Sequence, residues 1–150
     1  MSILNDLKFE GSNATQLLRN QHKNTVKICE NFLNKKISKE DFIEHIYFLL
    51  NVHFKIEEDI LYPPFEPILK KNLPYMEPLK MVLAEHKGVN NLFNKYNTLN
   101  EEHDYLKDIA ELLLQHVYKE ENGIFHQIDL LMPENLKNEI SEKINNFMEK

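Results

Sequence analysis

Two histidine–carboxylate pairs constrain this chain more than any other feature of its sequence. His53 precedes Glu57 by four residues, and His116 precedes Glu120 by the same spacing. Four residues make about one turn of an α-helix, so the two side chains of each pair project from the same face. Imidazole and carboxylate groups on one face can reach one ion. The two pairs therefore predict a helical protein with a shared metal site.

Composition supports one helical domain. A chain of 150 residues has the usual size of a single domain, which we expect to cover residues 1–150. Three glycines and the lack of tryptophan argue against a turn-rich β sandwich. The only cysteine, Cys29, excludes a disulfide framework and a thiolate zinc cluster, so nitrogen and oxygen must hold any metal.

Charge and hydropathy bear on partners and location. The net charge of -6, with lysines scattered along the chain, leaves no basic surface for nucleic acid. The N-terminal segment has no apolar run like that of a signal peptide, and no later segment could span a bilayer. We therefore expect a cytoplasmic protein with no nucleic-acid or membrane partner.

Apolar residues spaced three and four apart predict two long helices in the first half of the chain. The first begins at a cap at Ser12 or Asn13 and carries His22 within its apolar stripe. The second begins at a cap at Ser38. It ends at Pro63, because proline removes a backbone donor and interrupts a helix.

The second half of the chain follows the same plan. Residues 65–74 are predicted as a connection, and a third helix over residues 75–96 places His86 among apolar positions. A polar loop leads into a fourth helix that is loosened at Gly123, and a shorter helix starts after Pro133. The fold class is therefore all-α, an up-down-up-down four-helix bundle with an additional short C-terminal helix docked outside.

The two halves of the chain repeat one another. His22 and His86 are separated by 64 positions, and His53 and His116 by 63. This near-constant shift indicates a repeated helix pair arranged about a two-fold axis inside the bundle. The repeat predicts one cluster of four histidines and two carboxylates: His22, His53, Glu57, His86, His116 and Glu120.

A metal explains this cluster better than packing does. Burying so many ionisable groups costs several kcal/mol for each one unless they are paired or bound to metal. Ligands of this kind without thiolate suit iron, manganese or zinc, and six of them exceed the needs of one tetrahedral zinc ion. Two ions fit better, with Glu57 and Glu120 as candidate bridges.

The ordered set of six residues resembles the hemerythrin-like, or HHE cation-binding, family over essentially the whole chain. Residues 61–63 are also similar to the tail that follows the histidine–carboxylate motif in that family. The resemblance implies a four-helix bundle that holds two non-haem iron ions, oxo- or hydroxo-bridged as well as carboxylate-bridged, with manganese or zinc as other possible metals. It also implies a small partner: oxygen, nitric oxide or peroxide.

The third helix departs from part of this family. Oxygen-carrying hemerythrins take two histidines, four residues apart, from that helix, whereas Val82 and Asn90 flank His86 here. The set is more similar to the four-His, two-Glu centres of iron-sensing proteins and of proteins that repair iron–sulfur clusters after nitrosative stress. We expect a protein that binds or senses a small ligand or handles labile iron. The alternatives are an oxidoreductase that reduces nitric oxide or peroxide, and a structural helical interaction module.

Several nearby polar residues have less certain roles. Glu121 is the alternative to Glu120, because oxygen-carrying hemerythrins place their last carboxylate five residues after the histidine, but symmetry with Glu57 favours Glu120. Glu85 either supports the ligands or is a solvated carboxylate. Two residues are expected at the surface or beside the ligands, Glu58 and His126, and two are expected to be solvated, His45 and His103.

Overall fold

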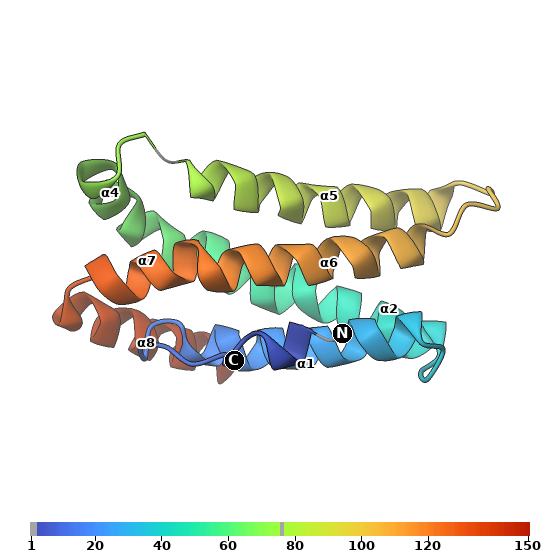
Figure 1. The fold of residues 1–150 in the computed structure, drawn as a ribbon, viewed down its shortest axis with the longest axis horizontal. Helices are drawn as coiled ribbons and strands as arrows, with labels where there is room; N and C mark the ends of the chain where they lie inside the picture. The colour runs from blue at the N-terminus through green and yellow to red at the C-terminus, as the bar shows by residue number, and fades with distance from the viewer. Residues whose placement is uncertain (1–2, 76) are drawn as a thin grey trace.

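The computed structural model describes residues 3–75 and 77–150, which form helices and connections without a strand. Four antiparallel helical stretches form the bundle, with α5 beside α6 and α6 beside α1 (Figure 1). These stretches are α1 (Gln16–Leu33), a second helix over residues 39–72, α5 (Pro78–Thr98) and α6 (Tyr105–Asn122). The predicted all-α bundle is confirmed.

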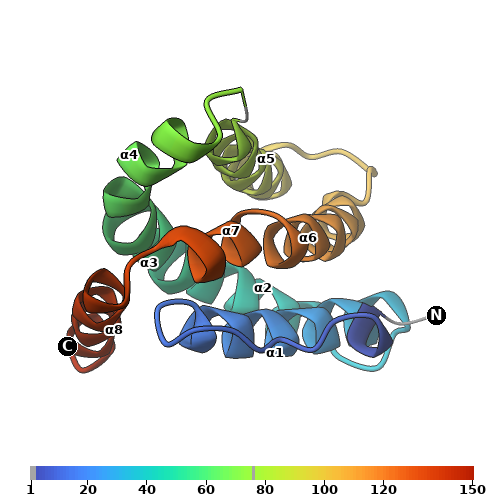
Figure 2. The same ribbon diagram turned by 60° about the vertical axis from the view of Figure 1, so that its left-hand side comes forward.

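The C-terminal part adds two helices to the bundle. After Gly123, α7 (Ile124–Leu131) extends the path of α6, and α8 (Glu134–Met148) lies outside the four helices against the second one (Figure 2). A side chain at Gly123 would place its Cβ 2.6 Å from the carbonyl oxygen of Lys119, so glycine permits the close approach at this break. The additional C-terminal helix is therefore confirmed.

The second helix consists of five successive segments: α2 (Lys39–Phe48), the π-helical η2 (Leu49–His53), α3 (Phe54–Ile56), the π-helical η3 (Glu57–Leu61) and α4 (Tyr62–Asn72). The backbone stays helical through the junctions, with φ -62° and ψ -50° at Glu57 and φ -75° and ψ -39° at Tyr62. The five segments therefore form one continuous helical stretch.

The prediction that this helix ends at Pro63 is wrong, as is the prediction of a connection over residues 65–74. Helix α4 reaches Asn72. Pro63 and Pro64 occupy the first turn of α4, directly after a π-helical segment. Proline's fixed φ suits a helical backbone, and the π-helical turn before these prolines already interrupts the regular α-helical bonding, so the helix continues past them.

Two other helix starts differ from prediction. Helix α1 begins at Gln16, and the side chain of Ser12 bonds to Asp129 instead of capping the helix. Helix α5 begins at Pro78, whereas the predicted helix covers residues 75–96. Residue 76 of that predicted range lies outside the described residues. The predicted cap at Ser38 is confirmed, because its hydroxyl oxygen accepts a 3.1 Å bond from the N–H of Asp41.

The main apolar core is divided into two clusters. One contains Leu18, Phe65 and Ile124, and the other contains Phe42 and Phe93. A layer of buried polar side chains lies between them, described below. Among the described residues, no helix combines the length and the apolar character needed to cross a bilayer.

Candidate metal centre

The structure brings the six predicted site residues together in the middle of the bundle. They come from four stretches: His22 from α1, His53 and Glu57 from the second helix, His86 from α5, and His116 and Glu120 from α6. Each is at most 4% exposed. They form two overlapping groups, each with two histidines and both glutamates, whose possible ligand atoms lie within 4.8 Å of one another.

Each glutamate faces both groups. Oε2 of Glu57 lies 3.4 Å from Nε2 of His53, while Oε1 lies 3.1 Å from Nε2 of His86. Oε1 of Glu120 lies 2.9 Å from Nε2 of His22, while Oε2 lies 3.6 Å from Nε2 of His116. Both carboxylates thus direct their two oxygens toward opposite halves of the repeat, an arrangement suited to bridging two ions.

The inward-facing atoms of this cluster lack hydrogen bonds. Within the described residues, the buried side-chain atoms without a hydrogen-bond partner are Nε2 of all four histidines, Oε1 of Glu57 and Oε1 of Glu120. Buried polar atoms are normally hydrogen-bonded, because burying them unpaired is costly. Six unpaired nitrogen and oxygen atoms that converge on one place fit a metal-ligand set, so the residues present fit the group that the sequence implies.

The outward-facing nitrogens of the same rings are all paired. The four Nδ1 contacts are His22 to Glu121 at 2.5 Å, His53 to Gln21 at 2.8 Å, His86 to Glu58 at 2.7 Å and His116 to Glu85 at 2.9 Å. A carboxylate or an amide oxygen here accepts a hydrogen bond from Nδ1–H, which leaves the Nε2 lone pair facing inward. This is the arrangement that orients histidine as a metal ligand.

The structure also places the residues whose roles were open. Glu120 faces the cluster, whereas Glu121 lies behind His22 and pairs with Arg19 at 2.6 Å. Glu85 supports a ring, as described, and its other oxygen lies 3.1 Å from Nζ of Lys119.

The three histidines outside the cluster differ in burial. His126 lies exposed on α7, and the exposed His103 pairs with Asp108. The prediction that His45 is solvated is wrong, because its ring is 7% exposed and its Nε2 lies 2.8 Å from the Thr25 hydroxyl oxygen. His45 faces α1, where Thr25 lies, instead of solvent.

Two supporting residues were missed at the sequence level. The hydroxyl of Tyr62 donates a 2.5 Å hydrogen bond to Oε2 of Glu120. Gln21 supports His53, and the repeat could have identified it, since Gln21 and Glu85 are separated by the same 64 positions as the two ligand histidines that follow them. No comparable signal marks Tyr62, because its role depends on how the second helix continues past the motif.

The electrostatics of the cluster favour positive charge. Burial alone would lower the pKa of His22, but the neighbouring carboxylates of Glu120 and Glu121 raise it to about 10. Burial would also lower the pKa of His86, but the carboxylates around it, chiefly that of Glu57, raise this pKa to about 9. The pKa of His53 is instead well below its usual value, because of burial and the neighbouring His22. The cluster thus combines a ring kept neutral with surroundings that attract a cation.

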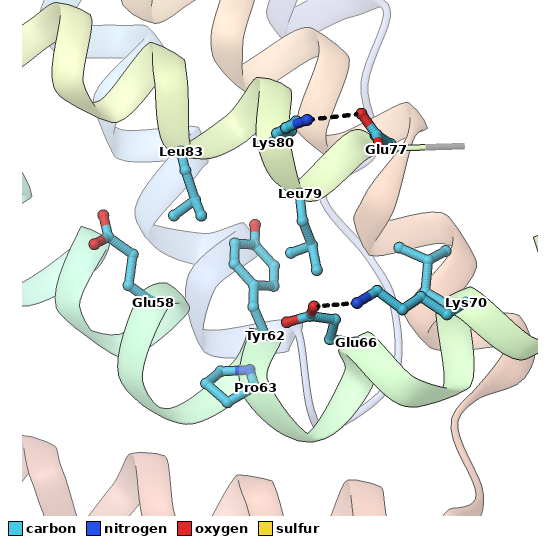
Figure 3. Close-up of a pocket in the computed structure, with 10 residues that line it drawn as sticks. Glu58, Tyr62, Pro63, Glu66, Lys70, Glu77, Leu79, Lys80 and Leu83 are labelled. Atoms are coloured by element: carbon cyan, nitrogen blue, oxygen red, sulfur yellow. Dashed lines mark ion pairs between the residues drawn. The ribbon is translucent and has the colours of Figure 1, made fainter. Parts of the chain in front are cut away.

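An aromatic ring packs against one histidine of each group of ligands. Phe54 stacks on His86 with ring centroids 3.8 Å apart, and Phe125 stacks on His22 at 5.1 Å. Tyr62 also lines a pocket of about 370 Å³ between α4 and the start of α5, drawn in Figure 3. Figure 3 further shows the ion pairs Glu66–Lys70 and Glu77–Lys80 at its rim. Tyr62 therefore connects an outer pocket to a carboxylate of the cluster.

Comparison with known proteins gives one match. No curated protein and no solved structure matches this chain. The family described as the hemerythrin HHE cation binding domain matches residues 13–128, a range that contains all six clustered residues. This chain therefore belongs to the hemerythrin HHE cation-binding domain family.

Proposed function

We propose that residues 1–150 form a single non-haem di-iron domain that binds a small ligand, such as oxygen, nitric oxide or peroxide, or that handles labile iron. The observation that carries the proposal is the set of six buried inward-facing atoms without hydrogen bonds. The proposed metal ligands are His22, His53, Glu57, His86, His116 and Glu120.

The donor set supports two ions of this kind. Each of the two groups offers two imidazoles and one oxygen from each shared glutamate, which are donors that suit iron, with manganese and zinc as other candidates. Four protein donors leave room for a small additional ligand at an ion that prefers six. Iron held in this way supplies a redox-active centre that can bind a diatomic molecule or peroxide.

The surrounding residues have distinct tasks in this proposal. The acceptors behind the four rings hold each Nε2 toward the cluster, and Tyr62 orients Glu120. Phe54 and Phe125 exclude water from the rings that they cover. The pocket beside Tyr62 brings a small molecule next to the residue whose hydroxyl contacts both glutamates.

Metal analysis tests the proposal. Protein expressed with ample iron, or reconstituted without oxygen, is expected to contain about two iron ions per chain, because two complete donor groups are present. Replacing His116 with alanine should remove at least one ion, whereas His103→Ala, at an exposed loop histidine, should leave the metal content unchanged. A metal content far below one ion per chain after reconstitution would contradict the proposal, and so would an equal content in both variants.

A further inference from the structure

The supports behind the four ligand histidines are not equivalent. Three of the four Nδ1 atoms face a carboxylate: Glu121, Glu58 and Glu85. The fourth, that of His53, faces the amide oxygen of Gln21 at 2.8 Å. One ring of the cluster is thus supported by a neutral group.

The internal repeat shows where the two halves differ. The first half contains His22 and His53, and the second contains His86 and His116. In each half, the residue directly before the first histidine supports the second one: Gln21 supports His53, and Glu85 supports His116. The residue directly after each clustered glutamate supports a histidine of the other half: Glu58 supports His86, and Glu121 supports His22. Both of these supports are glutamates. Gln21 against Glu85 is therefore the one mismatch in an otherwise matched set of supports.

This mismatch changes how strongly the rings bind metal. A carboxylate that accepts a hydrogen bond from Nδ1–H increases the electron density at Nε2 more than a neutral amide does, because the hydrogen bond is charge-assisted. Removing such a support weakens metal binding by about 10- to 100-fold. The group containing His53 should consequently bind its ion less tightly than the group containing His86 and His116.

A buried positive charge strengthens the difference. The guanidinium of Arg19 lies 2.6 Å from Glu121, and the side chains of both residues are at most 7% exposed. Arg19 thus neutralises Glu121, the carboxylate that supports the His22–His53 group. The support Glu85 also pairs with a cation, Lys119, but the side chain of Lys119 is 46% exposed, so water screens its charge.

We infer that the two metal positions have unequal affinities, with the position formed by His86 and His116 taking the first ion and Gln21 keeping the position formed by His22 and His53 weak. This inference rests on the proposed function, since it concerns the order in which two ions bind. It assigns to Gln21 a positioning role that sets the affinity of the second ion. The weaker position would gain and lose its ion at metal concentrations that leave the first ion bound.

Anaerobic titration of the metal-free protein with Co²⁺ measures both affinities. The visible absorption of bound Co²⁺, read against a competing chelator, is expected to give two stepwise dissociation constants that differ by about tenfold or more. The His53→Ala protein should keep the tighter constant, and the His86→Ala protein should lose it. Circular dichroism of each variant shows whether the helical fold is retained.

Two nearly isosteric exchanges at the mismatched positions provide the sharper test. Gln21→Glu should lower the dissociation constant of the weaker position by about tenfold, which brings the two constants closer together. Glu85→Gln should raise the dissociation constant of the tighter position by a similar factor. Gln115→Glu is the matched control, because Gln115 also precedes a ligand histidine but is exposed. This control should leave both constants unchanged.

The outcomes separate this inference from the proposal on which it rests. Two equal constants in the wild-type protein would overturn the inference but leave the two-ion site in place. The inference would fail in the same way if Gln21→Glu and Gln115→Glu shifted the constants equally, or if His86→Ala kept the tighter constant. A protein that binds no Co²⁺ would overturn both.

Discussion

At the scale of single residues, Tyr62 is the clearest test of how the cluster is held. It is 3% exposed, and its hydroxyl donates to Glu120 while lying 3.4 Å from Oε2 of Glu57. Tyr62→Phe would leave a buried carboxylate oxygen without its donor. Because hydrogen bonds to charged groups contribute about 1.5–3 kcal/mol, we expect the free energy of unfolding of the metal-free protein to fall by that amount in urea denaturation.

The matched control for this exchange is Tyr105→Phe. Tyr105 also donates a 2.5 Å hydrogen bond to a carboxylate, that of Glu101, but this bond is exposed at the start of α6. Exposed bonds of this kind exchange readily with water, so little change in stability is expected. Equal effects of the two exchanges would show that burial beside the cluster does not strengthen the bond of Tyr62.

The buried His45 makes a prediction about pH. Burial is the main cause that lowers its pKa to about 4 from 6.5. The unfolded chain therefore binds the proton more readily than the folded protein, so this residue reduces stability as the pH falls from 6.5 toward 4. His45→Gln retains a donor for Thr25 but does not titrate. Between pH 7 and 5, the metal-free variant should lose about 2 kcal/mol less stability than the wild type.

Urea denaturation at a series of pH values checks this expectation. His103→Gln is the control, because His103 is exposed in a loop. It should follow the wild-type pH dependence. Parallel curves for wild type and His45→Gln would contradict the expected coupling between burial and protonation.

The sequence predicted the positions of the candidate ligands better than their supports. Helical spacing and the repeat identify His53 and Glu57 as neighbours on one face, and the structure places them 3.4 Å apart. The same spacing placed His45 in solvent, because a helical offset states which residues share a face but not which helix covers the next face. Tyr62 could not be identified without the path of the helix beyond Pro63.

At the scale of helices, the second helix explains the largest error of prediction. Its π-helical segments η2 and η3 each add a residue to a turn, and the two candidate ligands lie at their inner ends, His53 at the end of η2 and Glu57 at the start of η3. Such turns occur frequently at functional sites. Neither the π turns nor the continuation into α4 is encoded in apolar periodicity, which assumes a uniform turn.

The attachment of α1 to α7 depends on Asp129. Its Oδ1 accepts bonds from the backbone N–H of Ser12 at 3.1 Å and the hydroxyl of Thr15 at 2.9 Å, and its Oδ2 lies 2.7 Å from Arg19. Asp129→Asn would remove the negative charge that pairs with Arg19 on the α7 side. Urea denaturation is expected to show a loss of about 1–3 kcal/mol.

The acid side of the stability curve offers a second readout for the same exchange. Although burial alone would raise the pKa of Asp129, bonds from Ser12 and Arg19 lower it. Its stabilising effect is therefore present at neutral pH and lost as the pH falls through the lowered pKa, so Asp129→Asn should reduce this acid-dependent loss. Asp6→Asn, at an exposed position, is the control. If Asp129→Asn lost as much unfolding free energy at acid pH as the wild type does, this role would be contradicted.

At the scale of the whole molecule, the cluster forms a polar layer between two apolar ones. Along α1 the order is Leu18, His22 and Cys29, and along α5 it is Val82, His86 and Val89. The apolar layers specify a bundle from periodicity alone, which is why the fold could be predicted. The polar layer buries ionisable side chains instead of apolar ones, and six of its atoms lack hydrogen bonds. Its stability therefore depends on what binds there.

Metal removal should therefore destabilise the entire bundle, because the six buried atoms without hydrogen bonds would lose their shared partner. A ligand present at about 1,000 times its dissociation constant stabilises the folded state by about 4 kcal/mol, and we expect a loss of at least this size when a strong chelator strips the iron-loaded protein before urea denaturation. The His103→Ala protein, altered at an exposed loop histidine, should show the same loss. The His53→Ala protein should show a smaller one, since it lacks a ligand from the start. Identical unfolding midpoints with and without chelator would instead indicate that the histidines are structural and that the layer is stable without metal.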